Sequence, residues 1–183
     1  TAFAVAVTIV LICGTARAAI VVFDRVALIG RPVQLMVLTR GRLFPEGGQL
    51  VTMSVGQTRL KKRLTGGDGY GYWMYSPVET GLIEITAEYE NGRESGTLLV
   101  MEPQERAILV DVDTAARESL LSVKLRQGTR TALEALSKYY RIIYLQGMTG
   151  LALTRRWLET SALPSSVVLS WRNVDRLELL ERD

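Results

Sequence analysis

Two apolar runs separated by one helical pattern constrain the fold of this chain more than any other feature. The runs are Ala107-Ile108-Leu109-Val110 and Ile142-Ile143-Tyr144-Leu145, and residues 129–140 between them repeat apolar positions at helical spacing. Short apolar runs rich in β-branched residues are typical of buried strands, and parallel strands joined by a helix take a right-handed crossover. With a second helix at 149–161 and a third strand at 167–170, the sequence predicts a small α/β Rossmann-like domain over residues 103–183.

Polar residues follow each of these runs. Asp111 and Asp113 come directly after Val110, and Gln146 comes directly after Leu145. Open parallel sheets place their ligands at the carboxyl ends of the strands. These three residues are therefore the candidate site.

The motif Asp111-Val112-Asp113-Thr114 after an apolar strand resembles the haloacid dehalogenase superfamily of phosphatases and phosphotransferases. The resemblance runs to about residue 169, because Leu158-Glu159-Thr160-Ser161-Ala162-Leu163-Pro164 and Val167-Val168-Leu169 look like the helix, turn and third strand of its lipin-like, phosphatidate-phosphatase branch. It implies that Asp111 is a nucleophile that forms an aspartyl-phosphate and that Asp113 is the general acid/base. It also implies that both carboxylates help to hold Mg²⁺.

The sequence departs from this family where phosphate and metal are bound. Ala115 stands at the Thr/Val place of the first motif, and Gln146 stands where the second strand should end in a phosphate-binding Thr or Ser. The acidic residues after the third strand have the spacing of a helix surface: Asp175, Glu178, Glu181 and Asp183. An Asp pair without its electrophilic partners loses most of the stabilisation of phosphoryl transfer. We therefore expect a vestigial site, no enzymatic activity and no cofactor, with Mg²⁺ required only if the chain is a phosphatase.

Residues 1–23 are apolar almost throughout and allow more than one interpretation. Ala16-Arg17-Ala18 fits the end of a secretory signal. The whole segment to Phe23 is also long enough to be a transmembrane helix with Arg17 at an interface. A buried helix of a soluble domain is the third possibility. We expect an uncleaved membrane anchor or signal over 1–23.

Residues 24–102 alternate short β-type runs with Gly, Pro and Asp-Gly turns. Strands are expected at 33–39, 50–55, 58–64, 70–75, 82–89 and 95–101, with a hairpin turn at Asn91-Gly92. Thr65-Gly66-Gly67-Asp68-Gly69-Tyr70, Pro77 and the alternating run from Thr80 to Tyr89 resemble the end of a bacterial immunoglobulin-like domain. The resemblance implies an all-β sandwich without chemistry of its own, in a class of domains found mostly outside the cytoplasm.

Aromatic residues in the fourth of these strands form a candidate contact patch, namely Tyr72, Trp73 and Tyr75. Side chains of a strand alternate between faces, so Tyr72 shares a face with Tyr70 while Trp73 and Tyr75 share the other, and one face must be core. The neighbouring Lys61-Lys62-Arg63 is expected to be a solvated strand edge, with anionic lipid contact as the alternative.

Composition excludes several classes of function. The chain has no His, which removes His-based metal sites, His ligation of haem and catalysis by Ser-His or Cys-His pairs. A net charge of +3 with scattered Lys and Arg argues against a nucleic-acid binder. The single Cys, Cys13, allows no disulfide within the chain.

Together these features predict a non-catalytic accessory or structural subunit that is anchored in a membrane and docks on a larger membrane protein complex. Its expected partners are the lipid bilayer and the other subunits of that complex, and its folded part is expected in the periplasm or otherwise outside the cytoplasm. The alternative is an Mg²⁺-dependent phosphatase that acts near the membrane on a lipid phosphate or another phosphomonoester. An adhesion or envelope-spacing module is a third possibility.

Overall fold

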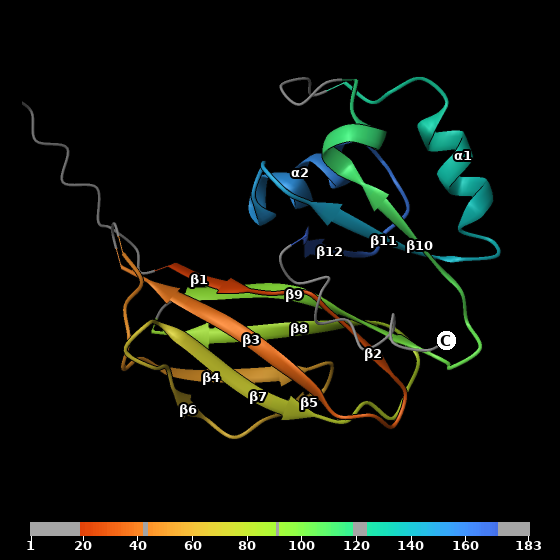
Figure 1. The fold of residues 1–183 in the computed structure, drawn as a ribbon. Coiled ribbons are helices and arrows are strands. Elements are labelled where there is room, and N and C mark those ends of the chain that lie inside the picture. Colours follow the sequence, from red (N-terminus) through yellow and green to blue (C-terminus); the bar gives the residue numbers. More distant parts are fainter. Residues whose placement is uncertain (1–18, 42–43, 91, 119–123, 172–183) are drawn as a thin grey trace, which may run out of the picture.

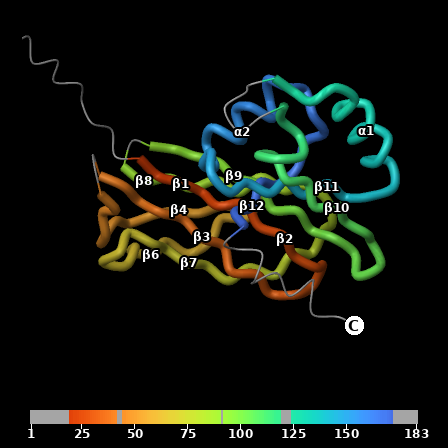
Figure 2. Tube along the Cα trace, turned by 45° about the horizontal axis from the view of Figure 1, so that its top comes forward, coloured from red at the N-terminus to blue at the C-terminus, as the bar shows by residue number. Residues whose placement is uncertain are grey.

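The computed structural model describes residues 19–41, 44–90, 92–118 and 124–171, which form a β-sandwich with an α/β unit stacked on one of its sheets (Figure 1). Turning the molecule keeps the α/β unit over the side of the sandwich that carries β2 and β9 (Figure 2). The molecule is therefore layered as sheet, sheet, parallel sheet and helices.

The sandwich has one sheet in the order β1-β3-β7 and another in the order β2-β9-β8-β4-β5, with β6 also paired to β4. The strands of the first sheet are β1 (Ala19–Val22), β3 (Val33–Arg40) and β7 (Tyr70–Tyr75). Those of the second are β2 (Arg25–Leu28), β4 (Leu50–Val55), β5 (Thr58–Arg59), β6 (Arg63–Leu64), β8 (Gly81–Tyr89) and β9 (Gly92–Met101). The chain thus changes sheets at Phe23 and Asp24, between β1 and β2.

Alternation of side chains explains why these runs are strands. Leu35, Val37 and Trp73 from the first sheet meet Met53, Ile85 and Leu98 from the second in one core, and all are buried. The strands expected from the sequence are confirmed, although 58–64 is divided into β5 and β6. The hairpin between β8 and β9 pairs Tyr89 with Gly92, so Gly92 opens the strand, while Asn91 lies outside the described residues.

The α/β unit is the predicted parallel sheet with the order β10-β11-β12. Its elements are β10 (Ala107–Asp111), a π-helical turn η1 (Val112–Ala116), α1 (Thr129–Leu136), β11 (Arg141–Gln146), α2 (Leu151–Thr160) and β12 (Val167–Ser170). The strand order runs in one direction, so right-handed crossovers place α1 and α2 on the same face of the sheet. Leu133 and Trp157 from these helices pack there against Val110 and Tyr144.

The sandwich covers the opposite face of the parallel sheet. Val26, Leu99 and Met101 on the outer face of the sandwich pack against the sheet residues Ile143, Leu145, Val167 and Leu169. Parallel sheets need cover on both faces, and here the second cover comes from the neighbouring domain of the same chain.

The expected N-terminal segment needs a corrected boundary. Residues 19–22 of the predicted 1–23 helix form β1 instead, since Ile20 and Val22 alternate into the sandwich core while Ala19 and Val21 face outward. Residues 1–18 lie outside the described part of the chain, and no helix within that part is long and apolar enough to cross a membrane.

The interface between the domains should support the stability of both. Replacing buried Leu145 with Ala is expected to lower the free energy of unfolding by about 2–5 kcal/mol, because it opens a cavity between the two sheets. Urea unfolding followed by far-UV circular dichroism and by Trp fluorescence measures this loss, and both signals should follow a single transition.

The matched control is Leu153→Ala on the exposed side of α2, which should change the free energy of unfolding by less than about 0.5 kcal/mol. An unchanged midpoint for Leu145→Ala, or separate transitions for the two signals, would show that the interface does not couple the domains.

Candidate functional site

Asp111 and Asp113 lie at the carboxyl end of β10, as predicted. Asp111 ends the strand and Asp113 lies in the π-helical turn η1 that follows it. The loop after β11, which begins at Gly147, lies against this turn, because Asp113 binds its backbone. The structure therefore brings both carboxylates and the end of the second strand to one edge of the sheet.

Asp111 caps the π-helical turn. Its Oδ1 accepts hydrogen bonds from the backbone N–H of Asp113 at 2.9 Å and of Thr114 at 3.2 Å. Its Oδ2 accepts from the Thr114 hydroxyl at 2.6 Å. A carboxylate used in this way satisfies the free N–H groups at the start of a helical turn.

Asp113 holds the loop after β11. Its Oδ2 accepts from the backbone N–H of Gly147 at 2.8 Å and of Met148 at 2.9 Å, and its Oδ1 accepts from the Thr149 hydroxyl at 2.9 Å. Burial by itself would raise the pKa of Asp113, but these donors and the positive charge of Arg117 outweigh it and hold the pKa below its usual value. Asp113 is therefore a buried anion that ties one loop to another.

Gln146 is also used within the protein. It is buried at the end of β11, and its Oε1 accepts from the N–H of Gly150 at 3.0 Å. Gly150 precedes α2, so the Gln146 side chain fixes the start of that helix. The acidic residues expected after the third strand (Asp175, Glu178, Glu181 and Asp183) lie outside the described residues.

The two carboxylates do not fit a Mg²⁺ ion in this arrangement. A carboxylate offers about four acceptor positions. Hydrogen-bond donors within the described structure already occupy three of these positions on Asp111 and three on Asp113. N–H groups and hydroxyls that point at an oxygen also oppose the approach of a cation. In the described part of the chain, no cluster of three or more Asp, Glu, His or Cys residues is arranged to hold a metal.

Arg117 is a buried cation beside this edge that the sequence did not single out. Its guanidinium carbon lies 4.6 Å from the centre of the Trp157 ring, and within the described structure its buried Nε has no hydrogen-bond partner. Stacking of this kind stabilises a cation in a water-poor setting. Arg117 thus adds positive charge near Asp113 and a packing contact with α2.

The predicted contact patch is divided between two faces. Trp73 is core, and its indole N–H donates to the carbonyl of Lys61 at 2.7 Å. Tyr75 packs against the same core, whereas Tyr72 faces outward and stacks at 6.3 Å on Tyr70. The expected alternation is confirmed, and Tyr72 is the member of the patch that is exposed.

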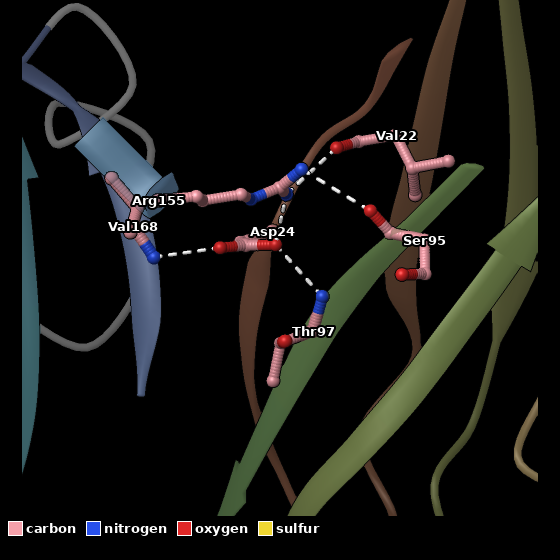
Figure 3. Close-up of polar contacts among 6 residues, drawn as sticks. All are labelled: Val22, Asp24, Ser95, Thr97, Arg155 and Val168. Carbon is pink, nitrogen blue, oxygen red and sulfur yellow. Dashed lines mark hydrogen bonds and ion pairs between the residues drawn. The ribbon is translucent and has the colours of Figure 1, made fainter. Parts of the chain in front are cut away.

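A polar centre that sequence reasoning missed lies where the two domains meet (Figure 3). Asp24 is buried at the point where the chain changes sheets, and its Oδ1 accepts from the N–H of Thr97 at 2.7 Å. Its Oδ2 accepts from the N–H of Val168 in β12 at 2.7 Å. Arg155 from α2 forms an ion pair with Asp24 and donates to the carbonyls of Val22 at 2.8 Å and Ser95 at 3.2 Å.

The environment of Asp24 is tightly built. Burial raises the pKa of Asp24, and Arg155 with the two backbone donors offsets only part of this effect. A Cβ at Gly96 would lie 3.1 Å from Oδ1 of Asp24 and 3.2 Å from Nη2 of Arg155, so glycine leaves room for the pair. The sequence feature that could have indicated this centre is the single carboxylate of Asp24 between two apolar β-type runs. A charged residue at such a position in a sandwich is buried and needs a partner.

A cleft of about 300 Å³ lies beside this centre, with Glu84, Ser95, Glu159 and Ser166 in its lining. Asp24 is the most buried charged residue in the lining of this cleft, and both of its carboxylate oxygens accept hydrogen bonds from Thr97, Arg155 or Val168. These bonds join the two domains.

Comparisons with known proteins give partial structural likenesses. No protein-family model matches the chain, and a search of curated proteins finds no significant match. The chain is similar to the D0-D1 domain of intimin at 16% identity over 45% of this chain and 46% of that one, with a TM-score of 0.37. It is also similar to the I9-I11 tandem of titin, at 17% identity over 51% of this chain and 38% of that one, with a TM-score of 0.36.

A further likeness is to the CARDB domain of the PF1109 protein from Pyrococcus furiosus, at 16% identity over 45% of this chain and 89% of that one, with a TM-score of 0.33. The chain thus spans about half the length of the intimin fragment. The neighbours are immunoglobulin-like and other β-sandwich domains, and the sandwich itself follows from the strand pairing of this chain.

The ion pair at the domain junction generates a prediction with a defined pH dependence. Arg155→Ala leaves the Asp24 carboxylate buried without its counter-charge and should lower the free energy of unfolding at pH 7 by about 3 kcal/mol. The folded-state pKa of Asp24 is raised, so its contribution is full below the unfolded value of about 4 and is lost as pH rises. Loss of Arg155 raises that pKa further.

Denaturant unfolding should therefore find Arg155→Ala more destabilised at pH 7 than at pH 4. The neighbouring exposed Arg156 provides the control, since Arg156→Ala should be nearly neutral at both values. Equal destabilisation by Arg155→Ala at the two pH values would contradict the role given to Asp24.

Proposed function

We propose that this chain is a non-catalytic, membrane-anchored accessory subunit that docks on a larger membrane protein complex. Its apolar residues 1–18 serve as the anchor, and its folded part lies outside the cytoplasm, in keeping with the resemblance of residues 65–89 to bacterial immunoglobulin-like domains. As part of this proposal, the α/β unit is a degenerate relative of the haloacid dehalogenase superfamily.

The observation that carries the proposal is the use of the candidate catalytic groups as structural acceptors. Asp111 caps η1, Asp113 holds the loop after β11, and Gln146 holds the start of α2. A nucleophile needs a lone pair that points at its substrate, and a general acid/base needs a proton that can leave. Here hydrogen bonds from backbone N–H groups and from the Thr114 and Thr149 hydroxyls occupy these oxygens instead.

An uncovered strand supports docking. Leu109 in β10 is on the sheet face that the sandwich covers at β11 and β12, since Ile108 and Val110 point toward the helices. Leu109 is 40% exposed, so the described part of the sandwich leaves this side chain incompletely covered. A partner laid against β10 would complete the cover of the parallel sheet.

The competing proposal is an Mg²⁺-dependent phosphatase of the haloacid dehalogenase type, acting near the membrane on a lipid phosphate or another phosphomonoester. The position of Asp111 and Asp113 at the carboxyl end of β10 favours it, as does the π-helical turn, a rare element that often occurs at functional sites. It requires the present donors to Asp111 and Asp113 to move away so that a metal and a phosphate can enter.

Substitution of Asp113 distinguishes the two proposals. Asp113→Asn presents an amide to the N–H groups of Gly147 and Met148, which should cost about 2–3 kcal/mol at pH 7. Because the folded-state pKa of Asp113 is lowered, its stabilisation is present above about pH 4 and is lost as pH falls through the folded value. Unfolding at several pH values measures this, with the exposed Asp68→Asn as a nearly neutral control.

Phosphate release by the wild-type chain is then measured with Mg²⁺ and several phosphomonoesters, a phosphatidate among them. The wild-type chain should release no more phosphate than Asp111→Asn does. Turnover that disappears in Asp111→Asn would establish the phosphatase and overturn the accessory role.

Docking is tested on native membranes solubilised in a gentle detergent. The chain should migrate with a large assembly on a native gel, and Leu109→Lys should release it because a charge cannot be buried against the partner. Leu82→Lys is the matched control, because Leu82 is 45% exposed on β8 in the sandwich. Migration of the wild-type chain at its own mass would count against a stable complex.

A further inference from the structure

Exposed apolar side chains gather at one end of the sandwich. Phe44 is 74% exposed, Leu64 is 65% exposed and Leu50 is 54% exposed. Leu50 and Leu64 are paired across β4 and β6, and Phe44 lies in the turn after β3, where Arg40 bridges to Pro45. Large exposed apolar side chains mark contact surfaces when they lie together.

A buried polar network holds this end in a defined shape. The hydroxyls of Thr39 and Thr65 lie 3.2 Å apart and are buried. The backbone carbonyl of Thr39 accepts from the N–H of Glu46 at 2.9 Å. The carbonyl of Thr65 accepts from the N–H of Gly48 at 3.0 Å, and the N–H of Thr65 donates to the carbonyl of Gln49 at 2.9 Å. These contacts tie the end of β3, the segment before β4 and the end of β6 to one another, so Leu50 and Leu64 are held in place while their side chains are exposed.

The first described strand, β1, begins at this same end. Residue 18 is followed by Ala19, which opens β1 and pairs with Arg40 at the end of β3. Figure 1 shows the start of β1 and β6 at the same end of the sandwich, on the left. Because residue 18 directly precedes Ala19 in the sequence, the proposed membrane anchor within residues 1–18 would bring Phe44, Leu50 and Leu64 toward the bilayer.

Positive charge borders this end. Lys61, Lys62 and Arg63 are exposed along the edge formed by β5 and β6, and Arg63 also donates to the carbonyl of Tyr72 at 3.3 Å. Arg40 is exposed beside Ala19. Lys and Arg next to apolar side chains are attracted to anionic headgroups while the apolar groups enter the interface.

We infer that the sandwich rests on an anionic lipid surface through the end that carries Phe44, Leu50 and Leu64, with Lys61 and Lys62 against the headgroups. This inference rests on the proposed membrane anchor and deepens it, because it fixes which end of the folded part faces the bilayer. The α/β unit, packed on the outer face of β2 and β9, is then held beside the bilayer with β10 available to a protein partner.

The test places an environment-sensitive dye on the full chain. In a Cys13→Ala background, Phe44→Cys and Leu64→Cys are each labelled with nitrobenzoxadiazole and mixed with vesicles of phosphatidylcholine and phosphatidylglycerol. Both positions should show a blue shift of emission and quenching by brominated lipid. Val78→Cys is the control, because Val78 is 78% exposed beyond the opposite end of β7.

Flotation of the same samples separates the possible failures. If the chain floats with the vesicles but Phe44→Cys and Leu64→Cys show no shift, or Val78→Cys shifts equally, the anchor stands and the inferred orientation is wrong. If the chain does not float, the membrane anchor itself fails. The double variant Lys61→Glu with Lys62→Glu tests the role of the lysines. It should reduce the blue shift of the dye on the vesicles that contain phosphatidylglycerol and leave it unchanged on pure phosphatidylcholine. An unaltered blue shift on both kinds of vesicle would exclude headgroup recognition by these lysines.

Discussion

The buried carboxylate of Asp24 is the constraint on which the arrangement of this molecule depends. It lies where the chain leaves β1 for β2, so it occupies the seam between the sheets of the sandwich, and there it accepts from Thr97 of β9. The same side chain accepts from Val168 on the edge of the parallel sheet and pairs with Arg155 of α2. A buried charge is costly unless every partner is in place, so the contacts fix the register of one domain on the other as well as hold them together.

Topology explains why such a junction is needed. A parallel sheet in the order β10-β11-β12 with right-handed crossovers has helices on one face only, and its other face must be covered from elsewhere. The outer face of β2 and β9 provides this cover for β11 and β12, and Asp24 satisfies an N–H at the free edge of β12. The sandwich is therefore a structural part of the α/β unit, and within the described residues its cover is thinnest at Leu109 of β10.

Sequence reasoning predicted local structure well and junctions poorly. Alternation in residues 82–89 and the apolar runs at Ile142 and Val167 identify strands and their buried faces, because periodicity reports burial directly. Leu153 is exposed although Trp157 and Leu158 of the same helix are buried, since apolar periodicity does not tell how far a covering layer extends. Residues 19–22 were assigned to a membrane helix because an apolar strand and the end of an apolar helix look alike. The pairing of Asp24 with Arg155, 131 residues away, leaves no periodic signal.

The same carboxyl edge can serve catalysis or architecture, and the direction of its hydrogen bonds is the observation that favours architecture in our proposal. In a phosphotransferase, electropositive groups at this edge must face the substrate, because catalysis depends on stabilising charge that develops on the transferred group. Here the N–H groups of Gly147 and Met148 face Asp113, and those of Asp113 and Thr114 face Asp111. The carboxylate oxygens of both residues are therefore hydrogen-bonded within the fold, and the charge of Asp113 stabilises the folded chain.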